Sequence, residues 1–190
     1  GNFTFGVSTA GPTFSISNAS TIANQTGYGV TTTTARTLIG TVSSPVGFSA
    51  TPLLVTLTVI SPNGTTYCAT QAQVNGANVL TGADVSAAAS GACTPVSATS
   101  VSIDPTTAQE GLYQLVAQAR DVAGNTSSLI TRTFVIDRTL PTVTNVVPSP
   151  IPLRGGQPAT FTAQAADNLG LVGSHAVVNY ATSTELNLRY

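Results

Sequence analysis

Few side chains in this 190-residue sequence could do catalytic chemistry. His175 is the only histidine, Glu110 and Glu185 are the only glutamates, and no acidic residue lies within seven positions of the histidine. Catalysis needs a nucleophile with a base, a pair of carboxylates or a metal cluster, and each of these requires several such groups close together. We therefore expect no enzymatic activity, and we interpret His175 as a surface or interface residue.

The two cysteines, Cys68 and Cys93, are the other reactive pair. In a lysine-free chain rich in β-branched residues we expect them to form a disulfide, which implies an oxidising compartment. The bridge would close a loop of about 25 residues and stabilise the fold by roughly 3 kcal/mol in the chain-entropy model. Two reduced, buried thiols are the alternative. Two cysteines and one distant histidine do not favour a zinc site.

The charge of the chain is unusually low. Charged residues make up 7% of the sequence and the net charge is −1, whereas soluble proteins carry about 25% charged residues. This balance does not favour a nucleic acid or an anionic membrane as partner, and no apolar run reaches the ~18 residues of a membrane span. We expect an extracellular or cell-surface protein whose partners are copies of itself or further repeats of the same chain. Asn-x-Ser/Thr matches mark exposed polar loops and leave glycosylation open at Asn2, Asn18, Asn24, Asn63 and Asn125.

Strands must position these residues, because apolar and polar residues alternate along the chain and no window carries a helical stripe. Turn signals at residues 61–64 and 124–125 separate the alternating segments. We predict an all-β fold, an antiparallel β-sandwich with at most one helical turn at residues 106–110 and a loop at residues 82–92. The two clearest rows expected to face the core are Leu53, Val55, Leu57 and Val59, and Tyr113, Leu115, Ala117 and Ala119.

Three segments of the chain resemble bacterial immunoglobulin-like repeats. They are a Gly-x-Tyr strand start at Gly111-Leu112-Tyr113, an Asp-x-Ala-Gly-Asn hairpin at residues 121–125 and an Asp-x-Thr-x-Pro exit at residues 137–141. Such repeats occur in surface adhesins, in S-layer and fibre proteins, and as accessory modules of secreted enzymes. The resemblance covers roughly residues 43–140 and implies an immunoglobulin-like sandwich in which Tyr113 returns its hydroxyl to a backbone group. Between Tyr67 and Ile103 the chain departs from the pattern, and the cysteine pair with its small-residue loop resembles an insertion.

Calcium is the one ion that the resemblance suggests, because in related arrays such ions stiffen the junctions between repeats. Calcium takes several oxygen ligands from Asp, Asn and backbone carbonyls. The alternative is that these side chains form turn bonds to the backbone or, for Asp137, an arginine pair. We therefore expect no cofactor, with calcium as the only candidate. The candidate ligands are Asp121, Asn125, Asp137, Asp167 and Asn168.

The chain divides into three parts on this interpretation. Residues 43–140 form one complete sandwich, residues 1–42 supply N-terminal strands, and residues 141–190 begin a second immunoglobulin-like sandwich. The flanking parts are each too short to fold alone, but together they are about the size of one domain. Strands of the second sandwich are expected at residues 142–147, 158–167 and 174–180.

Three arrangements of the flanking parts stay open. The chain is a fragment of a longer tandem array, or both parts close one sandwich within the chain, or the N-terminal strand is donated to a neighbouring subunit. In the last case the donor residues would be Phe3, Phe5 and Val7, which alternate with smaller or polar neighbours.

The function that these features favour is structural. We expect a repeat unit of an extracellular fibre, S-layer or adhesin stalk. The alternatives are a loop-mediated glycan- or receptor-binding module and an accessory domain of a secreted enzyme. The fold hosts many functions, so the resemblance alone does not choose among them.

Overall fold

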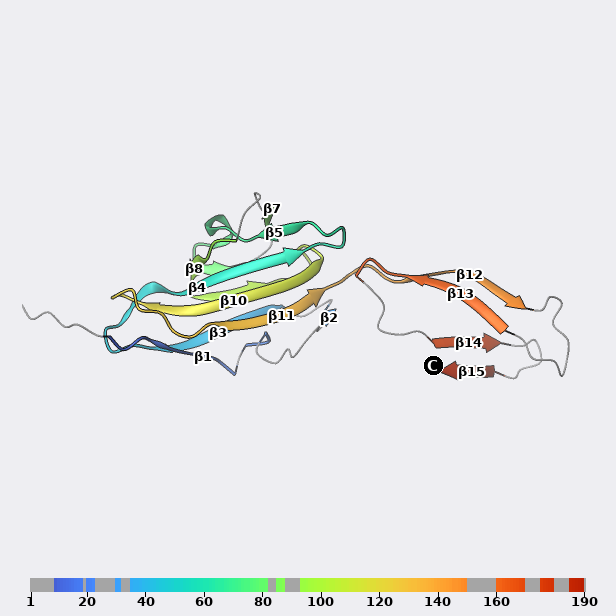
Figure 1. Cartoon of the computed structure of the whole chain (residues 1–190), viewed down its shortest axis with the longest axis horizontal. Helices are drawn as coiled ribbons and strands as arrows, with labels where there is room; N and C mark the ends of the chain where they lie inside the picture. The colour runs from blue at the N-terminus through green and yellow to red at the C-terminus, as the bar shows by residue number, and fades with distance from the viewer. Residues whose placement is uncertain are drawn as a thin grey trace, which may run out of the picture. The chain divides into compact units, whose positions relative to one another are not determined.

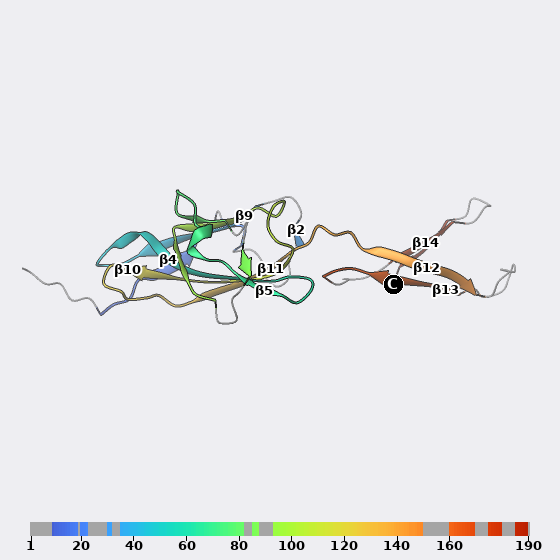
Figure 2. The same cartoon turned by 90° about the horizontal axis from the view of Figure 1, so that it is seen from above.

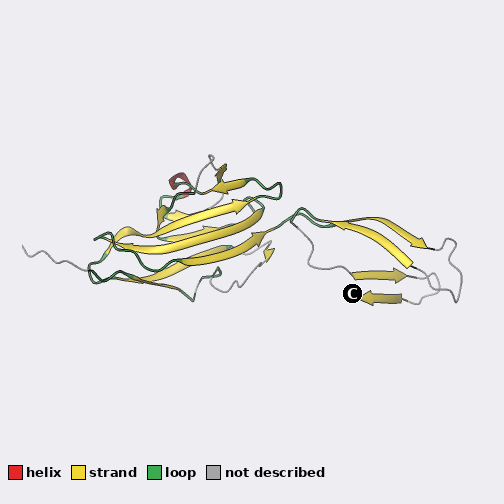
Figure 3. Ribbon diagram, viewed as in Figure 1, coloured by secondary structure: helices red, strands yellow, loops and turns green. Residues whose placement is uncertain are grey.

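The computed structural model describes residues 9–18, 20–22, 30–31, 35–81, 85–87, 93–149, 160–169, 175–179 and 185–189. The chain divides into two compact units, Gly1–Arg138 and Thr139–Tyr190. Strands dominate both units (Figure 1). The only helix in the described part of the chain is the short 3₁₀ turn η1 (Gln71–Gln73), coloured red in Figure 3. The all-β prediction is confirmed.

The first unit is a β-sandwich of two sheets. Figure 2 shows them as layers, with β9 in one layer and β10, β11 and β5 in the other. One sheet has the order β1 (Thr13–Ile16), β3 (Arg36–Ser43), β9 (Ser100–Ile103), β6 (Val79–Leu80). The other has the order β2 (Val30–Thr31), β11 (Ile130–Ile136), β10 (Gly111–Asp121), β4 (Phe48–Ile60), β5 (Thr66–Cys68), β7 (Ser86–Ala87), with β8 (Val96–Ala98) also paired to β4.

The core lies on the inner faces of β4 and β10. These strands pair antiparallel, with Leu57 opposite Leu115 and Val55 opposite Ala117. Since residues two apart share one face of a strand, the predicted rows become two buried stripes, and every side chain in them is at most 1% exposed. Leu38 and Val101 of the other sheet cover these stripes and are fully buried. Both predicted core rows are confirmed.

The N-terminal strands belong to this sandwich. β1 pairs antiparallel with β3, and β3 pairs with β9. The hydroxyl of Ser20 accepts from the backbone N–H of Ile39 (2.7 Å) and donates to its carbonyl (2.8 Å), so residues 20–22 extend the edge of β3. Ile22, fully buried, joins the core as a result.

This arrangement differs from the expected division at residue 42. β3 crosses that position and covers the inner face of β4 and β10, so residues 43–140 have no complete core without it. The described N-terminal strands therefore complete the first unit, and they are not available to close a sandwich with residues 141–190. The expected boundary at residues 140–141 lies close to the observed division after Arg138.

Tyr113 fixes the loop that leads into β10. Its ring is fully buried and stacks on Phe134 with centroids 4.8 Å apart, and its hydroxyl donates to the carbonyl of Gln109 at 2.6 Å. Burial raises the pKa of this hydroxyl, which therefore stays a donor. The hydroxyl-to-backbone bond predicted for Tyr113 is present.

A single turn precedes this loop. The N–H of Ala108 donates to the carbonyl of Asp104 at 2.9 Å, and the guanidinium of Arg138 donates to the carbonyls of Pro105 (2.6 Å) and Ala108 (2.7 Å). The helical turn predicted at residues 106–110 is therefore not a helix: a hydrogen-bonded turn forms slightly earlier, at residues 104–108, and Arg138 binds two of its carbonyls.

The second unit contains two hairpins among its described residues. β12 (Thr142–Ser149) pairs with β13 (Thr160–Ala166), and β14 (His175–Asn179) pairs with β15 (Glu185–Arg189). The three strands expected here agree with β12, β13 and β14, whereas β15 was not expected. Valines of β12 are exposed to solvent, with exposed fractions of 61% for Val143, 63% for Val146 and 47% for Val147.

Gly111 offers a direct test of how β10 is seated against β4. Its φ is +151°, and a Cβ at this position would overlap the carbonyl oxygen of Ile60. We expect Gly111→Ala to lower the free energy of unfolding by about 1–3 kcal/mol, because alanine is strained at this φ and its Cβ would collide with the Ile60 carbonyl. Chemical denaturation followed by circular dichroism measures this.

Gly76→Ala is the matched control, because a Cβ there meets open space. Both substitutions remove similar entropy from the unfolded chain, so their difference isolates the strain. Equal stabilities of the two variants would contradict the seating of β10 described above.

Candidate functional site

The turn that follows β10, residues 121–125, is held by one carboxylate. Oδ1 of Asp121 accepts from the backbone N–H of Asn125 at 2.9 Å, and Oδ2 accepts from the Asn125 amide at 3.1 Å and from the hydroxyl of Ser44 at 3.3 Å. The backbone turns at Gly124, whose φ is +89°, a conformation that glycine adopts without strain. The N–H of Val122 donates to the carbonyl of Gly47 at 3.2 Å, so this turn is also tied to the corner between β3 and β4.

These hydrogen bonds set the charge state of Asp121. Burial alone would raise its pKa, but the donors of Asn125 and Ser44 together outweigh burial and hold the pKa of the carboxyl below its ordinary value. The carboxyl is therefore ionised at neutral pH, and its side chain is committed to the turn.

The five calcium candidates are divided between the two units. Asp121 and Asn125 bond to each other, as the alternative interpretation expected. Asp137 follows β11 in the first unit, whereas Asp167 and Asn168 follow β13 in the second. Oδ1 of Asp167 accepts from the N–H of Leu169 at 2.9 Å. No group of three His, Cys, Asp or Glu side chains suited to a metal occurs among the described residues, and calcium binding stays a prediction.

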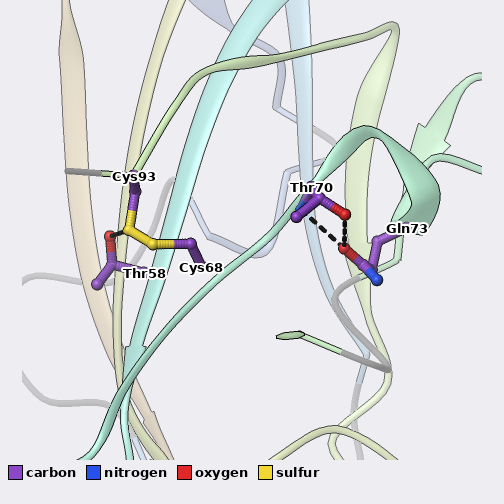
Figure 4. Close-up of a disulfide and its surroundings, with 5 residues drawn as sticks. All are labelled: Thr58, Cys68, Thr70, Gln73 and Cys93. Atoms are coloured by element: carbon purple, nitrogen blue, oxygen red, sulfur yellow. Dashed lines mark hydrogen bonds between the residues drawn. A yellow bond between two sulfur atoms is a disulfide. The ribbon is translucent and has the colours of Figure 1, made fainter. Parts of the chain in front are cut away.

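Cys68 and Cys93 form a disulfide, as predicted, with Cα atoms 5.5 Å apart (Figure 4). The bridge ties the end of β5 to the residues that lead into β8, and the hydroxyl of Thr58 on neighbouring β4 lies 3.4 Å from the sulfur of Cys93. Beyond β5, the N–H and hydroxyl of Thr70 both donate to the side-chain oxygen of Gln73, at 2.7 and 2.8 Å. A disulfide of this kind indicates a non-reducing compartment.

A pocket of about 340 Å³ opens beside the turn at residues 121–125. It lies where β10, the first half of β4 and β8 run side by side, since Leu54 pairs with Gln118 on one side and with Ser97 on the other. The lining residues are Ser49, Thr51, Leu54, Ser97, Arg120, Asp121, Val122 and Gly124.

No pattern in the sequence predicts this pocket. The alternation along β10 gives the direction of the Arg120 side chain, and it is indeed exposed. The neighbouring hydroxyl of Ser97 arrives through the pairing of β8 with β4, which no local pattern indicates. The predicted donor residues Phe3, Phe5 and Val7 lie outside the described residues.

Comparison with known proteins identifies no related protein. No family model matches the chain, and neither a curated protein nor a solved structure matches it. Among the residues that the structure describes, no helix has the length and apolar character needed to cross a membrane.

The Asp121 carboxylate makes folding sensitive to acid. Because its pKa is lowered in the folded state, its contribution to stability is fully present above the unfolded pKa of about 3.9 and is lost as pH falls through the folded pKa. We expect Asp121→Asn to be less stable than the parent chain at neutral pH, and the difference to shrink below about pH 4. Thermal melts from neutral to strongly acidic pH measure both effects.

Asp104, whose pKa is lowered by hydrogen bonds from Thr106, titrates in both proteins and cancels from the comparison. A difference between parent and variant that stays constant across the acid range would show that the Asp121 charge does not stabilise the turn.

Reduction of the disulfide should cost stability mainly through the unfolded chain. The bridge closes a separation of 25 residues, and we expect its reduction to lower the free energy of unfolding by about 3 kcal/mol. Denaturation with and without a reductant measures the effect. The double variant Cys68→Ser/Cys93→Ser is the control, because the reductant should not change its stability, and an equal response of both proteins would contradict the assignment.

Proposed function

We propose that the first unit is an immunoglobulin-like sandwich of the repeat type. The strand orders support this: β1-β3-β9 corresponds to A-B-E and β11-β10-β4 to G-F-C of the immunoglobulin constant fold. The hydrogen bond from Tyr113 in β10 to Gln109, upstream in the chain, matches the tyrosine corner of strand F. In this assignment η1 and β5 to β8 carry the insertion between the C and E strands.

The protein then serves as a structural module outside the cell, a repeat unit of a surface fibre, S-layer or adhesin stalk, and not as an enzyme. The observation that carries this is the direct succession of two β units. β11 ends the first sandwich at Ile136, and residues 137–141 lead into β12, which begins at Thr142. A short connection that contains Pro141 and its restricted backbone suits tandem repeats. The disulfide and the low charge are consistent with an extracellular setting.

Strand donation between copies is the form of assembly that we favour. The second unit exposes the valines of β12, and two-stranded hairpins leave edges to which a further strand can add. The segment of residues 1–12 is suited to the role because Phe3, Phe5 and Val7 alternate, which would present all three to one face of an acceptor sheet.

A peptide of residues 1–12 tests the assembly. We expect it to bind the full chain, measured by fluorescence anisotropy, and to suppress any polymer seen by electron microscopy, because it occupies the acceptor. The same peptide with Phe3→Ser, Phe5→Ser and Val7→Ser is the control and should not bind, since it has lost the apolar row.

The size of the native material separates the two structural forms. Regular polymers of 19.1-kDa chains would support donation, and one much longer polypeptide would support a tandem array. A chain that stays monomeric at high concentration and ignores the peptide would contradict assembly by donation.

A binding module is the second candidate function, and the pocket beside residues 121–125 favours it. The pocket combines residues of β4, β8 and β10 with the turn at residues 121–125, and in this assignment that turn is the F–G loop, one of the recognition loops of immunoglobulin-like domains. This role is compatible with a place in a fibre or adhesin.

A further inference from the structure

The pocket beside residues 121–125 contains a positively charged side chain, that of Arg120, which is available to a ligand. The guanidinium of Arg120 makes no hydrogen bond or ion pair with any residue that the structure describes, and its side chain is exposed. One of its terminal nitrogens lies 3.8 Å from the place that a Cβ of Gly124 would occupy, so the guanidinium reaches across the turn.

Arg138 and Arg132 of the first unit are already engaged. Arg138 binds two backbone carbonyls and lies 3.6 Å from the carboxylate of Glu110. Arg132 donates to the carbonyl of Thr131 at 2.7 Å. The guanidinium of Arg120 is therefore available for a ligand. A guanidinium can bind a carboxylate through two parallel hydrogen bonds.

Asp121 does not occupy this fork. Its carboxylate is 4% exposed and accepts hydrogen bonds from Asn125 and Ser44. Asp121 also lines the pocket, but it is nearly buried and its oxygens are taken up by these donors. The exposed charge that a ligand can reach in the pocket is that of Arg120.

The rest of the lining suits a sugar ring. Ser49, Thr51 and Ser97 contribute hydroxyls. The Ser49 hydroxyl donates to the carbonyl of Thr51 at 3.2 Å and offers a ligand an acceptor, whereas the other two hydroxyls can donate or accept. Leu54 and Val122 add aliphatic surface for the C–H face of a ring. A volume of about 340 Å³ is at the small end of ligand pockets, which span about 300–1,000 Å³.

One wall of the pocket is preorganised. The side-chain amide of Gln71 donates to the carbonyl of Ser97 at 3.1 Å and accepts from its N–H at 2.9 Å. These two hydrogen bonds satisfy the backbone groups of Ser97 that a neighbouring strand would otherwise bind. The backbone of Ser97 is therefore fixed before a ligand binds. Preorganisation of this kind reduces the entropy lost on binding.

We propose that this pocket binds an acidic sugar, with the carboxylate of a uronic acid on Arg120 and the ring hydroxyls on Ser49, Thr51 and Ser97. The inference rests on the binding module, the second candidate function, and not on assembly by strand donation. A single exposed ion pair with a few hydroxyl contacts predicts weak binding, with a dissociation constant of about 1 mM per sugar, and higher avidity on a polysaccharide through several repeats.

Titration of the full chain with sodium glucuronate, followed by amide NMR, is the experiment. We expect saturable shifts at Ser97, Val122 and Gly124, which weaken as NaCl is added because the ion pair is exposed to solvent. Glucose lacks the carboxylate and acetate lacks the ring, and we expect neither to match glucuronate. Equal binding of glucose would overturn the role of Arg120, and equal binding of acetate would overturn the assignment to a sugar.

Arg120→Gln supplies the test on the protein. It keeps a polar side chain at an exposed position, and we expect it to weaken glucuronate binding at least about tenfold, as the loss of a charged hydrogen-bond donor does. Arg132→Gln is the matched control and should bind as the parent chain does. Undiminished binding by Arg120→Gln, or shifts confined to residues far from the turn, would overturn the proposal.

The experiments distinguish sugar binding by the pocket from assembly by strand donation, because either can be disproved without the other. Arg120→Gln lies outside residues 1–12, so it should leave peptide binding and polymer formation unchanged. Loss of glucuronate binding with normal assembly supports the pocket, and normal assembly without any glucuronate binding by the parent chain removes the pocket while the structural role stands.

Discussion

The antiparallel ladder between β4 and β10 is the constraint on which the rest of the first unit depends. β10 lies between β11 and β4, and the register of its pairing with β4 sets which core side chains lie opposite one another, such as Leu115 and Leu57. The ladder shifts register between Ala119 and Asp121, and this irregularity releases the strand into the turn at residues 121–125. One face of β10 thus builds the core, while the end of its other face supplies Arg120 to the pocket.

Those parts of the fold that follow from local chemistry could be predicted from the sequence. Alternation in residues 53–59 and 113–119 defines which face is buried, whatever the partner strand is. Tyr113 needs a partner for its hydroxyl once its ring is buried, and Gly124 adopts the positive φ that the turn requires. The disulfide could be predicted from composition, because the chain has only two cysteines and no further set of metal ligands for them.

The choice of partner strands could not be predicted in the same way. Phe14 and Ile16 alternate as any strand would, and only the pairing of β1 with β3 places them in the first sandwich. Ser20 illustrates the difficulty. It lies in an irregular segment, yet its hydroxyl bonds to the N–H and the carbonyl of Ile39 as a neighbouring strand would, and no local pattern predicts this. The pocket has the same origin: Ser97 reaches Leu54 through a pairing of distant segments, and the register of such pairs is a property of the whole sheet.

The Cys68–Cys93 bridge also sets how far the chain can be drawn out under tension. A polypeptide pulled from both ends lengthens by about 3.3–3.6 Å for each residue released. The separation of 25 residues between the cysteines therefore withholds about 80–90 Å of contour length while the bridge stands. A fibre made of such units would be less extensible than its residue count implies, and a reducing agent would lengthen it without breaking the main chain.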